Sequence, residues 1–376
     1  MRASDGTGYR VDITDGALDA RNALLADVID HRRVQVFTGP TVHRLYGNRL
    51  RDYLGRHLEP GSWQVHEIPT GETAKTFTTV ELVCALAKSG GLDRRGVMMA
   101  MGGGVTADIV GFAASVFGRG VDHIRLTTTL LSQVDVGVGV KTGVNALGSK
   151  NMLGSYHPAL GSISDLDLLT TLPVREIRCG MAEIVKMAVI LGADLFTALE
   201  MQPRLFEGSD AAHPRTAASR NEVTRRAMRL MLDELHTNLR ERDLARLVDF
   251  GHTFSPVIEM ASGHRIAHGE SVAIDMALSA RIAAVLGQLS NDDADRIVAL
   301  LTAIGLPVDD FPTCTPRLLT SAMDAARARR GQRLNLVLPT AIGAATFVDD
   351  VPPGVLDEAL LQMRRRPAGR PLGLVR

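Results

Sequence analysis

The stretch "VMMAMGGGVTADIVGF", residues 97–112, contains the pattern that decides the fold of the first half of the chain. A short apolar run ends in the glycines Gly102–Gly104, and Thr106 and Asp108 then open a run with helical spacing. Glycines let a phosphate group approach the backbone, and the free N–H groups at the start of a helix favour an anion. The stretch is not a G-x-G-x-x-G motif, so a tight turn without a ligand is the alternative interpretation.

Strand-like and helix-like runs alternate on both sides of this stretch. Besides the central run, the strand-like runs are residues 32–39, 63–69 and 122–129, and the helix-like runs are residues 41–58, 76–90 and 106–120. Strands that alternate with helices of this length indicate a parallel sheet covered on both faces. The first half is therefore predicted to be a Rossmann-like, nucleotide-binding α/β domain.

The spacing of apolar residues changes in the second half, where they recur every three to four positions. Runs of this kind are residues 174–200, 221–239, 270–287, 291–305 and 315–330, and one late piece, residues 333–348, looks extended. We therefore predict an α/β domain over residues 1–160, a mostly helical domain over residues 161–362 and a disordered tail over residues 363–376.

Composition excludes several classes of protein. The 376 residues exceed what one hydrophobic core usually supports. Lys plus Arg and Asp plus Glu number 42 each, so no overall charge attracts nucleic acid or an acidic membrane. Cys84, Cys179 and Cys314 lie far apart, which argues against a disulfide framework and favours a reducing cytoplasm. We expect neither a signal peptide nor a membrane span, because no apolar run has the required length or flanks.

Two stretches concentrate polar groups in unusual surroundings. Residues 127–154 place Asp135, Lys141, Asn145, Lys150 and Asn151 among glycines and small residues. This pattern suggests a crevice whose lysines hold a phosphate as point charges, and a polar surface loop is the alternative. In residues 179–190, Glu183 and Lys186 share one face of an apolar helix, where a simple salt bridge is the alternative to a functional pair.

The stretch "DFGHTFSPVIEMASGHRIAHGE", residues 249–270, contains His252 and His268. Two histidines alone are weak evidence for a metal, but a distant glutamate would complete the open three-ligand site of a catalytic zinc. Spacing cannot select that glutamate. Pro256 fits either a helix capped by Ser255, with the proline at its first position, or a helix that runs from His252 and is kinked at the proline.

Taken together, these stretches resemble the dehydroquinate synthase-like sugar phosphate cyclases. The resemblance extends from about residue 33 to residue 348, and its motifs occur in the family's order: "GGGVTADIVGFAASVFGRG", "TTLLSQVDVGVGVKTGVN", "KNMLG", "TLPVREIRCGMAEIVK", "GHTF" and "HGE". It implies an NAD-binding α/β domain, a helical metal- and substrate-binding domain, an active site between them and a homodimer. It also implies Zn²⁺, or Co²⁺, held by Glu183, His252 and His268.

The resemblance assigns further roles residue by residue. The implied NAD contacts are Glu72, Lys75, Gly103, Gly104, Val105, Asp108, Thr128, Thr129, Asp135, Lys141 and Lys150. The implied catalytic residues are Lys186, Lys141, Asp135 and Asn151. The implied contacts to the sugar phosphate are Lys150, Asn151 and Asp249, and Arg327, or else Arg329 and Arg330, takes the place of the family's phosphate lysine. Arg119 resembles an arginine that such dimers lend to the neighbouring subunit's phosphate.

Four positions separate this chain from the usual dehydroquinate synthase pattern. Those enzymes typically have a lysine at Met231, an arginine at Ala245, an asparagine at Asp249 and a histidine at Pro256. The lost positive charge suits a substrate without a carboxylate. Within the family, the chain looks most like the sedoheptulose 7-phosphate cyclases that form 2-epi-5-epi-valiolone, the first step of C7-cyclitol biosynthesis.

The resemblance implies a reaction with transient oxidation by NAD, elimination of phosphate, reduction and an intramolecular aldol closure. A 3-dehydroquinate synthase and a 2-epi-valiolone synthase are the nearest alternatives, and they share the fold and cofactors. A metal-dependent polyol dehydrogenase is more distant, because the lysines at positions 141 and 150 favour a phosphorylated substrate. A catalytically inactive binding protein is disfavoured, because the metal, phosphate and nucleotide motifs are all present.

Overall fold

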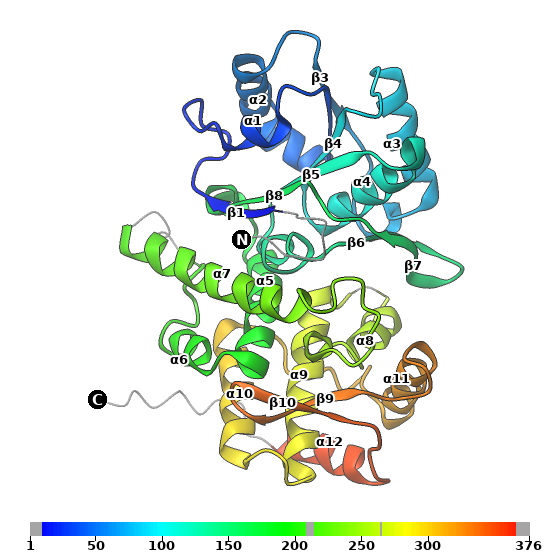
Figure 1. The fold of residues 1–376 in the computed structure, drawn as a ribbon. Coiled ribbons are helices and arrows are strands. Elements are labelled where there is room, and N and C mark those ends of the chain that lie inside the picture. Colours follow the sequence, from blue (N-terminus) through cyan, green and yellow to red (C-terminus); the bar gives the residue numbers. More distant parts are fainter. Residues whose placement is uncertain (1–9, 208–213, 264, 366–376) are drawn as a thin grey trace. The chain divides into compact units, whose positions relative to one another are not determined.

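Two compact units make up the chain in a computed structural model that describes residues 10–207, 214–263 and 265–365 (Figure 1). The first unit is Met1–Pro173 with Leu235–Arg240, and the second is Val174–Glu234 with Glu241–Arg376. Within the described ranges, no helix combines the length and apolar character that a membrane span requires.

The first unit is built on a parallel six-stranded sheet in the order β1-β8-β5-β4-β2-β3. The strands are β1 (Arg10–Thr14), β2 (Val34–Thr38), β3 (Trp63–Glu67), β4 (Val97–Gly102), β5 (Asp122–Thr127) and β8 (Gly161–Asp165). β2 and β4 are neighbours, and the chain leaves them toward opposite edges of the sheet. Ligands of open α/β sheets usually bind outside the carboxyl ends of strands at such a switch point.

Helices cover both faces of this sheet, because its central strands are apolar on both sides. α1 (Leu24–Ile29) and α2 (Pro40–His57) pack on a core that includes Val34, Val36, Met99 and Leu126. α3 (Phe77–Ser89) and α4 (Gly104–Val116) pack on the alternate residues of the same strands, among them Phe37, Met98 and Ala100 (Figure 1). The predicted Rossmann-like α/β fold is confirmed for this unit.

The glycine-rich stretch after β5 forms a π-helical turn and an antiparallel hairpin. The turn is Ser132–Val136, and the hairpin pairs β6 (Lys141–Ala146) with β7 (Ser149–Tyr156). The buried guanidinium of Arg125 in β5 connects this segment to the sheet, because it donates to the carbonyl oxygens of Val136, Gly139 and Lys141. The interpretation as a surface loop is wrong for residues 141–156. The short helical turns η1 (Glu72–Ala74), η2 (Phe117–Arg119) and η4 (Leu166–Thr171) complete the unit.

The second unit is mostly helical, as predicted. Its elements are α5 (Val174–Leu191), α6 (Ala193–Met201), α7 (Pro214–Leu235), η6 (Leu247–Asp249), α8 (Ser255–Ala261), α9 (His268–Val285), α10 (Asn291–Ile304), α11 (Pro316–Arg329), the hairpin strands β9 (Leu336–Ala341) and β10 (Ala344–Val348), and α12 (Val355–Arg365). α9 lies at the centre and contacts α5, α8, α10, α12 and β9 (Figure 1). Residues 271–283 of this helix are all buried, so it is the core of the unit.

Three details differ from the sequence expectations. The predicted domain boundary after residue 160 precedes β8, whose hydrogen bonds to β1 and β5 place it in the sheet. The predicted tail begins too early, because α12 continues through residues 363–365, and residues 366–376 lie outside the described residues. Neither interpretation of Pro256 is right, since α8 begins at Ser255 after an N-cap at Phe254, and His252 lies in the turn before it.

Candidate active site

The start of α4 follows the carboxyl end of β4 at the switch point of the sheet. Gly103 is the N-cap and Gly104 the first helical residue, and no side chain caps the helix. A Cβ atom on Gly103 would lie 3.1 Å from Thr129 Cγ2, and one on Gly104 would lie 3.2 Å from Val136 Cγ2. A side chain at either position would be tighter than usual, so the Thr129 or Val136 side chain would have to shift by a few tenths of an ångström. Val105 and Asp108 follow in the first turns of α4. Thr128, directly after β5, donates its N–H to the carbonyl oxygen of Gly102 at the end of β4, at 3.0 Å.

Six polar residues form one group beside α4, which we call the hairpin cluster: Glu72, Lys75, Asp108, Asn145, Lys150 and Asn151. Lys75 is buried, and its Nζ lies 2.6 Å from Asp108 Oδ2 and 2.6 Å from Asn151 Oδ1. Burial raises the pKa of the Asp108 carboxyl, whereas the charge of Lys75 opposes that rise. The loop before α3, the helix α4 and the hairpin are thus connected through one ammonium group.

Asn145 makes the second connection in the hairpin cluster. Its Nδ2 donates to Glu72 Oε1 at 2.7 Å, and its Oδ1 accepts the backbone N–H of Asn151 at 2.9 Å. The Nζ of Lys150 lies 3.5 Å from the same Glu72 oxygen. Asn145 is one of the polar residues of this stretch, but its sequence pattern predicts no role for it. The only signal in the sequence is its position between Lys141 and Lys150 in a glycine-rich stretch.

Three other predicted residues lie in further elements of the first unit, and the charge of Asp135 contributes to the raised pKa of Asp108. Asp135 is in the π-helical turn, and Lys141 is the first residue of β6. Arg119 ends η2 with a positive φ of 72°. Their proposed roles stay predictions.

The second unit brings together Glu183, His252 and His268, which we call the metal-ligand cluster. Glu183 comes from the middle of α5, His252 from the turn before α8, and His268 is the first residue of α9. Glu183 Oε1 lies 3.7 Å from His252 Nε2 and 3.5 Å from His268 Nε2. One donor atom from each residue lies within 4.8 Å of the other two. This donor set, one carboxylate and two imidazoles, suits a catalytic zinc ion.

The surroundings of the two histidines direct the same ring nitrogen of each toward Glu183. His252 Nδ1 lies 3.0 Å from the carbonyl oxygen of Phe250, and His268 Nδ1 lies 3.5 Å from Glu259 Oε2. A carbonyl or carboxylate behind a histidine commonly fixes the tautomer that presents the other nitrogen to a metal. Glu259 is buried on α8 and was not identified from the sequence.

The electrostatics of this cluster also fit a metal ion. Lys186 Nζ lies 2.6 Å from Glu183 Oε2, and both side chains are almost fully buried. Apart from this ion pair, neither carboxylate oxygen of Glu183 has a hydrogen bond of normal geometry with the described residues. Burial would raise the pKa of Glu183, but Lys186 and the histidines hold it well below the ordinary value. A buried carboxylate that is ionised and lacks well-formed hydrogen bonds is a suitable ligand for a cation.

The two histidines differ in their proton affinity without a metal. Burial and the charge of Lys186 lower the pKa of His252 to about 4. Burial also disfavours the charged form of His268. The interactions of His268 with Glu183 and Glu259 outweigh this effect of burial and raise the pKa of His268 to about 9. A metal ion would therefore replace a proton on His268 at neutral pH, as is usual when metals bind histidine.

Close packing of α9 against α5 places His268. A Cβ atom on Gly269 would lie 2.4 Å from the Cα and carbonyl oxygen of Cys179, so only glycine fits there. The guanidinium of Arg175 also binds both carboxylate oxygens of Glu270 at 2.6 and 2.7 Å. α5, which carries Glu183, is thereby held against the first turn of α9.

His252 is placed by the same central helix. Gly251 has a φ of 75°, and a Cβ atom there would lie 2.9 Å from Met276 Cγ. Asp275 Oδ2 accepts the backbone N–H groups of Phe254 and Ser255 at 2.5 and 2.9 Å. Asp275 therefore satisfies donors at the start of α8, a task that an N-cap side chain usually performs.

The two arginines proposed for the phosphate lie in different surroundings. Arg330 donates to Asp249 Oδ2 at 3.1 Å and to Thr253 Oγ1 at 3.3 Å, so it contacts residues on both sides of His252. Arg327 pairs instead with Asp324 on the surface of α11. Asp249 also accepts from Arg246 at 2.5 Å. The structure thus brings Arg330 and Asp249 next to the metal-ligand cluster but not Arg327.

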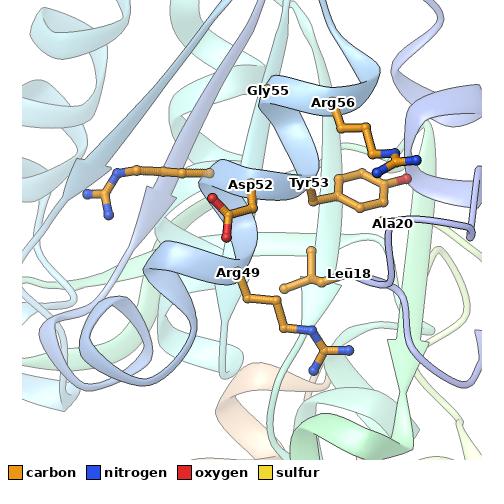
Figure 2. A pocket seen from close by; sticks show the side chains of 8 residues that line it. Leu18, Ala20, Arg49, Asp52, Tyr53, Gly55 and Arg56 are labelled. Carbon is orange, nitrogen blue, oxygen red and sulfur yellow. The ribbon is translucent and has the colours of Figure 1, made fainter.

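A separate recess lies on the α2 side of the first unit. Its volume is about 490 Å³, and Figure 2 shows the side chains that line it, including Arg49, Asp52, Tyr53 and Arg56. None of the predicted site residues lines this recess. It is therefore not the candidate active site.

Comparison with known proteins agrees with the geometry of both units. The 3-dehydroquinate synthase N-terminal model matches residues 65–179, and the C-terminal model of the same family matches residues 180–326. A 2-epi-5-epi-valiolone synthase of Streptomyces glaucescens is 60% identical over 97% of this chain and 94% of that protein.

Solved structures show the same fold. The 2-epi-5-epi-valiolone synthase ValA of Streptomyces hygroscopicus subsp. jinggangensis 5008, solved with NAD⁺ and Zn²⁺ bound, has 40% identity and a TM-score of 0.89 over 98% of this chain and 99% of that one. A 2-deoxy-scyllo-inosose synthase with carbaglucose-6-phosphate, NAD⁺ and Co²⁺ has 22% identity and a TM-score of 0.82 over 96% and 98%, which supports the fold alone. The chain therefore belongs to the dehydroquinate synthase-like sugar phosphate cyclases and resembles the 2-epi-5-epi-valiolone synthases among them.

Proposed function

We propose that this protein is an NAD- and zinc-dependent cyclase that converts sedoheptulose 7-phosphate to 2-epi-5-epi-valiolone and releases phosphate. Such an enzyme is a carbon–oxygen lyase and would catalyse the first step of C7-cyclitol biosynthesis. The observation that carries it is the convergence of Glu183, His252 and His268, with both Nε2 atoms directed at one buried carboxylate oxygen. A relative named as a 2-epi-5-epi-valiolone synthase, 60% identical to this chain, supports the product, and the resemblance of the sequence motifs supplies the substrate.

The residues present fit both cofactors. Glu183, His252 and His268 would hold the zinc ion, which would lower the pKa of a substrate hydroxyl and polarise its C–O bond. The start of α4 and the hairpin cluster would hold NAD⁺, which accepts a hydride and returns it within one turnover. Cobalt is a reasonable substitute, because it accepts the same nitrogen and oxygen ligands.

The chain's own residues would bind and orient the sugar phosphate. Lys150 and Asn151, in β7 of the hairpin, would bind the phosphate group, and Lys141 would contact substrate and cofactor. Lys186 holds Glu183 ionised, and its ammonium group would also orient a substrate hydroxyl near the metal-ligand cluster. Arg330 is proposed to support Asp249 and Thr253 in addition to any phosphate contact.

A second candidate, 3-dehydroquinate synthase activity, is less well supported by the surroundings of His252. That substrate carries a carboxylate, which calls for cationic side chains. Met231, in α7, is buried and apolar and offers no cation. Near His252, the guanidinium charges of Arg246 and Arg330 are already offset by the carboxylates of Glu241 and Asp249, which leaves no net positive charge for a substrate carboxylate.

The test is incubation of the purified protein with sedoheptulose 7-phosphate, NAD⁺ and Zn²⁺. We expect release of inorganic phosphate without net formation of NADH, and nuclear magnetic resonance of the product would separate 2-epi-5-epi-valiolone from 2-epi-valiolone. Turnover of the seven-carbon keto-acid phosphate alone would show a dehydroquinate synthase. Net accumulation of NADH would show a polyol dehydrogenase.

Other expectations stay predictions. We propose a homodimer in which Arg119 reaches the neighbouring subunit's phosphate, and size-exclusion chromatography with light scattering would test it. A cytoplasmic location is proposed because Cys84, Cys179 and Cys314 are all free thiols, which suits a reducing compartment.

A further inference from the structure

We propose that Asn145 is a positioning residue that sets the places of Glu72 and Asn151 at the same time. The inference rests on the proposed function, in which Glu72 contacts NAD⁺ and Asn151 contacts the sugar phosphate. The side chain of Asn145 bonds to both residues. Its Nδ2 donates to Glu72 Oε1, and its Oδ1 accepts the backbone N–H of Asn151. One amide group would then align the cofactor contact with the substrate contact.

The hairpin is irregular at this position. Val144 pairs with Leu153, but Ala146 pairs with Ser149, so residues 150–152 stand opposite Asn145. Such a bulge bends a strand and redirects its side chains, and bulges are frequent next to active sites. Lys150 and Asn151, the two residues proposed to bind phosphate, lie in this bulge.

Asn151 also has an unusual backbone. Its φ is 53°, in the left-handed region, which asparagine enters more readily than most other side chains but which still benefits from support by its surroundings. The bond from its N–H to Asn145 Oδ1 and the bond from Lys75 Nζ to its Oδ1 supply that support. The backbone N–H of Asn145 donates to the carbonyl oxygen of Lys75 at 2.8 Å, which closes a ring of contacts.

Asparagine is the side chain that meets these requirements. An amide offers a donor and an acceptor on one short, planar group. The substitution Asn145→Asp would keep the acceptor for Asn151 but remove the donor, and it would set a second carboxylate against Glu72. The substitution Asn145→Ala would remove both bonds. The two variants therefore separate the two functions of the side chain.

The experiment measures the dissociation constant of NAD⁺ for the zinc-loaded protein by calorimetry. The KM for sedoheptulose 7-phosphate is measured at saturating NAD⁺, and the melting temperature is recorded. We expect Asn145→Asp to weaken NAD⁺ binding about tenfold with little change in KM, because one hydrogen bond to a charged group is lost. Asn145→Ala should weaken NAD⁺ binding and also raise KM. Leu147→Ala, at the exposed tip of the same hairpin, is the matched control and should change neither constant.

The outcomes separate this inference from the proposed function. Wild-type binding of NAD⁺ and turnover of the substrate test the function, and if both are absent, both proposals are wrong. If the wild type is active and both Asn145 variants keep its constants, only the inference is wrong. Equal losses in both constants for both variants, together with a lower melting temperature, would show a merely structural role and also overturn it.

Discussion

Replacing Gly269 with alanine would place a methyl group against the backbone of α5. The added Cβ would lie 2.4 Å from the Cα and the carbonyl oxygen of Cys179, whereas ordinary contacts begin near 3.4 Å. The start of α9 would have to retreat by about 1 Å, because the opposing atoms belong to a helix backbone and cannot rotate away. His268 immediately precedes this position and would move with it.

The expected loss is large for metal binding and moderate for stability. Metal-ligand distances tolerate only about 0.2 Å, so a displacement of about 1 Å should reduce zinc affinity by about 100-fold or more. Overpacking of this kind costs about 1–3 kcal/mol, part of which the better helix propensity of alanine offsets. The variant should thus lose zinc before it loses its fold.

The assay titrates zinc into the apoprotein against a coloured competing chelator and records urea unfolding without metal. Gly55→Ala is the matched control, because Gly55 lies in helix α2 and its added Cβ would meet Trp63 at an ordinary 3.7 Å. That variant should keep wild-type zinc affinity, and its free energy of unfolding should rise by up to about 1 kcal/mol because alanine favours the helix. Wild-type zinc affinity in Gly269→Ala would refute the argument that close packing places His268.

Three further predictions concern charges and thiols in the second unit. Glu183→Ala should lose zinc and reduce the free energy of unfolding by about 3–5 kcal/mol, because the buried Lys186 charge loses the carboxylate 2.6 Å away. Adding Lys186→Met should restore stability but not zinc, and a double variant as unstable as the single one would contradict this. Burial raises the pKa of Asp275 to about 6, from 3.8, so its ionisation costs stability as the pH rises from about 4 to 6. The free energy of unfolding of Asp275→Asn, measured in urea, should therefore rise relative to that of the wild type by up to about 3 kcal/mol between pH 4 and pH 7. If the two free energies differ by a constant amount across that range, the raised pKa of Asp275 is wrong. Burial also raises the pKa of Cys179 to about 12 and of Cys314 to about 11, so iodoacetamide at pH 8 should label these thiols much more slowly in native than in unfolded protein, with equal rates by mass spectrometry speaking against their burial.

Much of the first unit could be predicted from the sequence because its pattern is local. Continuous apolar runs such as Val97–Gly102 indicate strands buried on both faces, and each is followed by a run of helical spacing. The order of the strands depends on contacts between distant segments, which spacing does not contain. The β6–β7 hairpin was missed because its glycines and lysines show no alternation, and buried Arg125 connects that region to the sheet.

The candidate site was predictable only in part. His252 and His268 are visible in one short stretch, but no rule of spacing connects them to Glu183, which comes from another helix, and the family resemblance supplied it. Glu259 and Asp275 were missed because their roles follow from the packing of α8 on α9. Ser255 looked like a helix cap, but Asp275 takes that task across the core, so local propensity was overridden.

The burial of α9 has a consequence for how this sequence can change. Residues 271–283 touch neighbours on every side, so a substitution anywhere along them disturbs a packed contact. The same helix begins with His268 and carries Asp275, which holds the turn of His252. Substitutions in this segment would therefore alter catalysis and folding together. In a mutant library, substitutions should be tolerated least there. New specificities are more easily reached through the loops and the hairpin than through this helix.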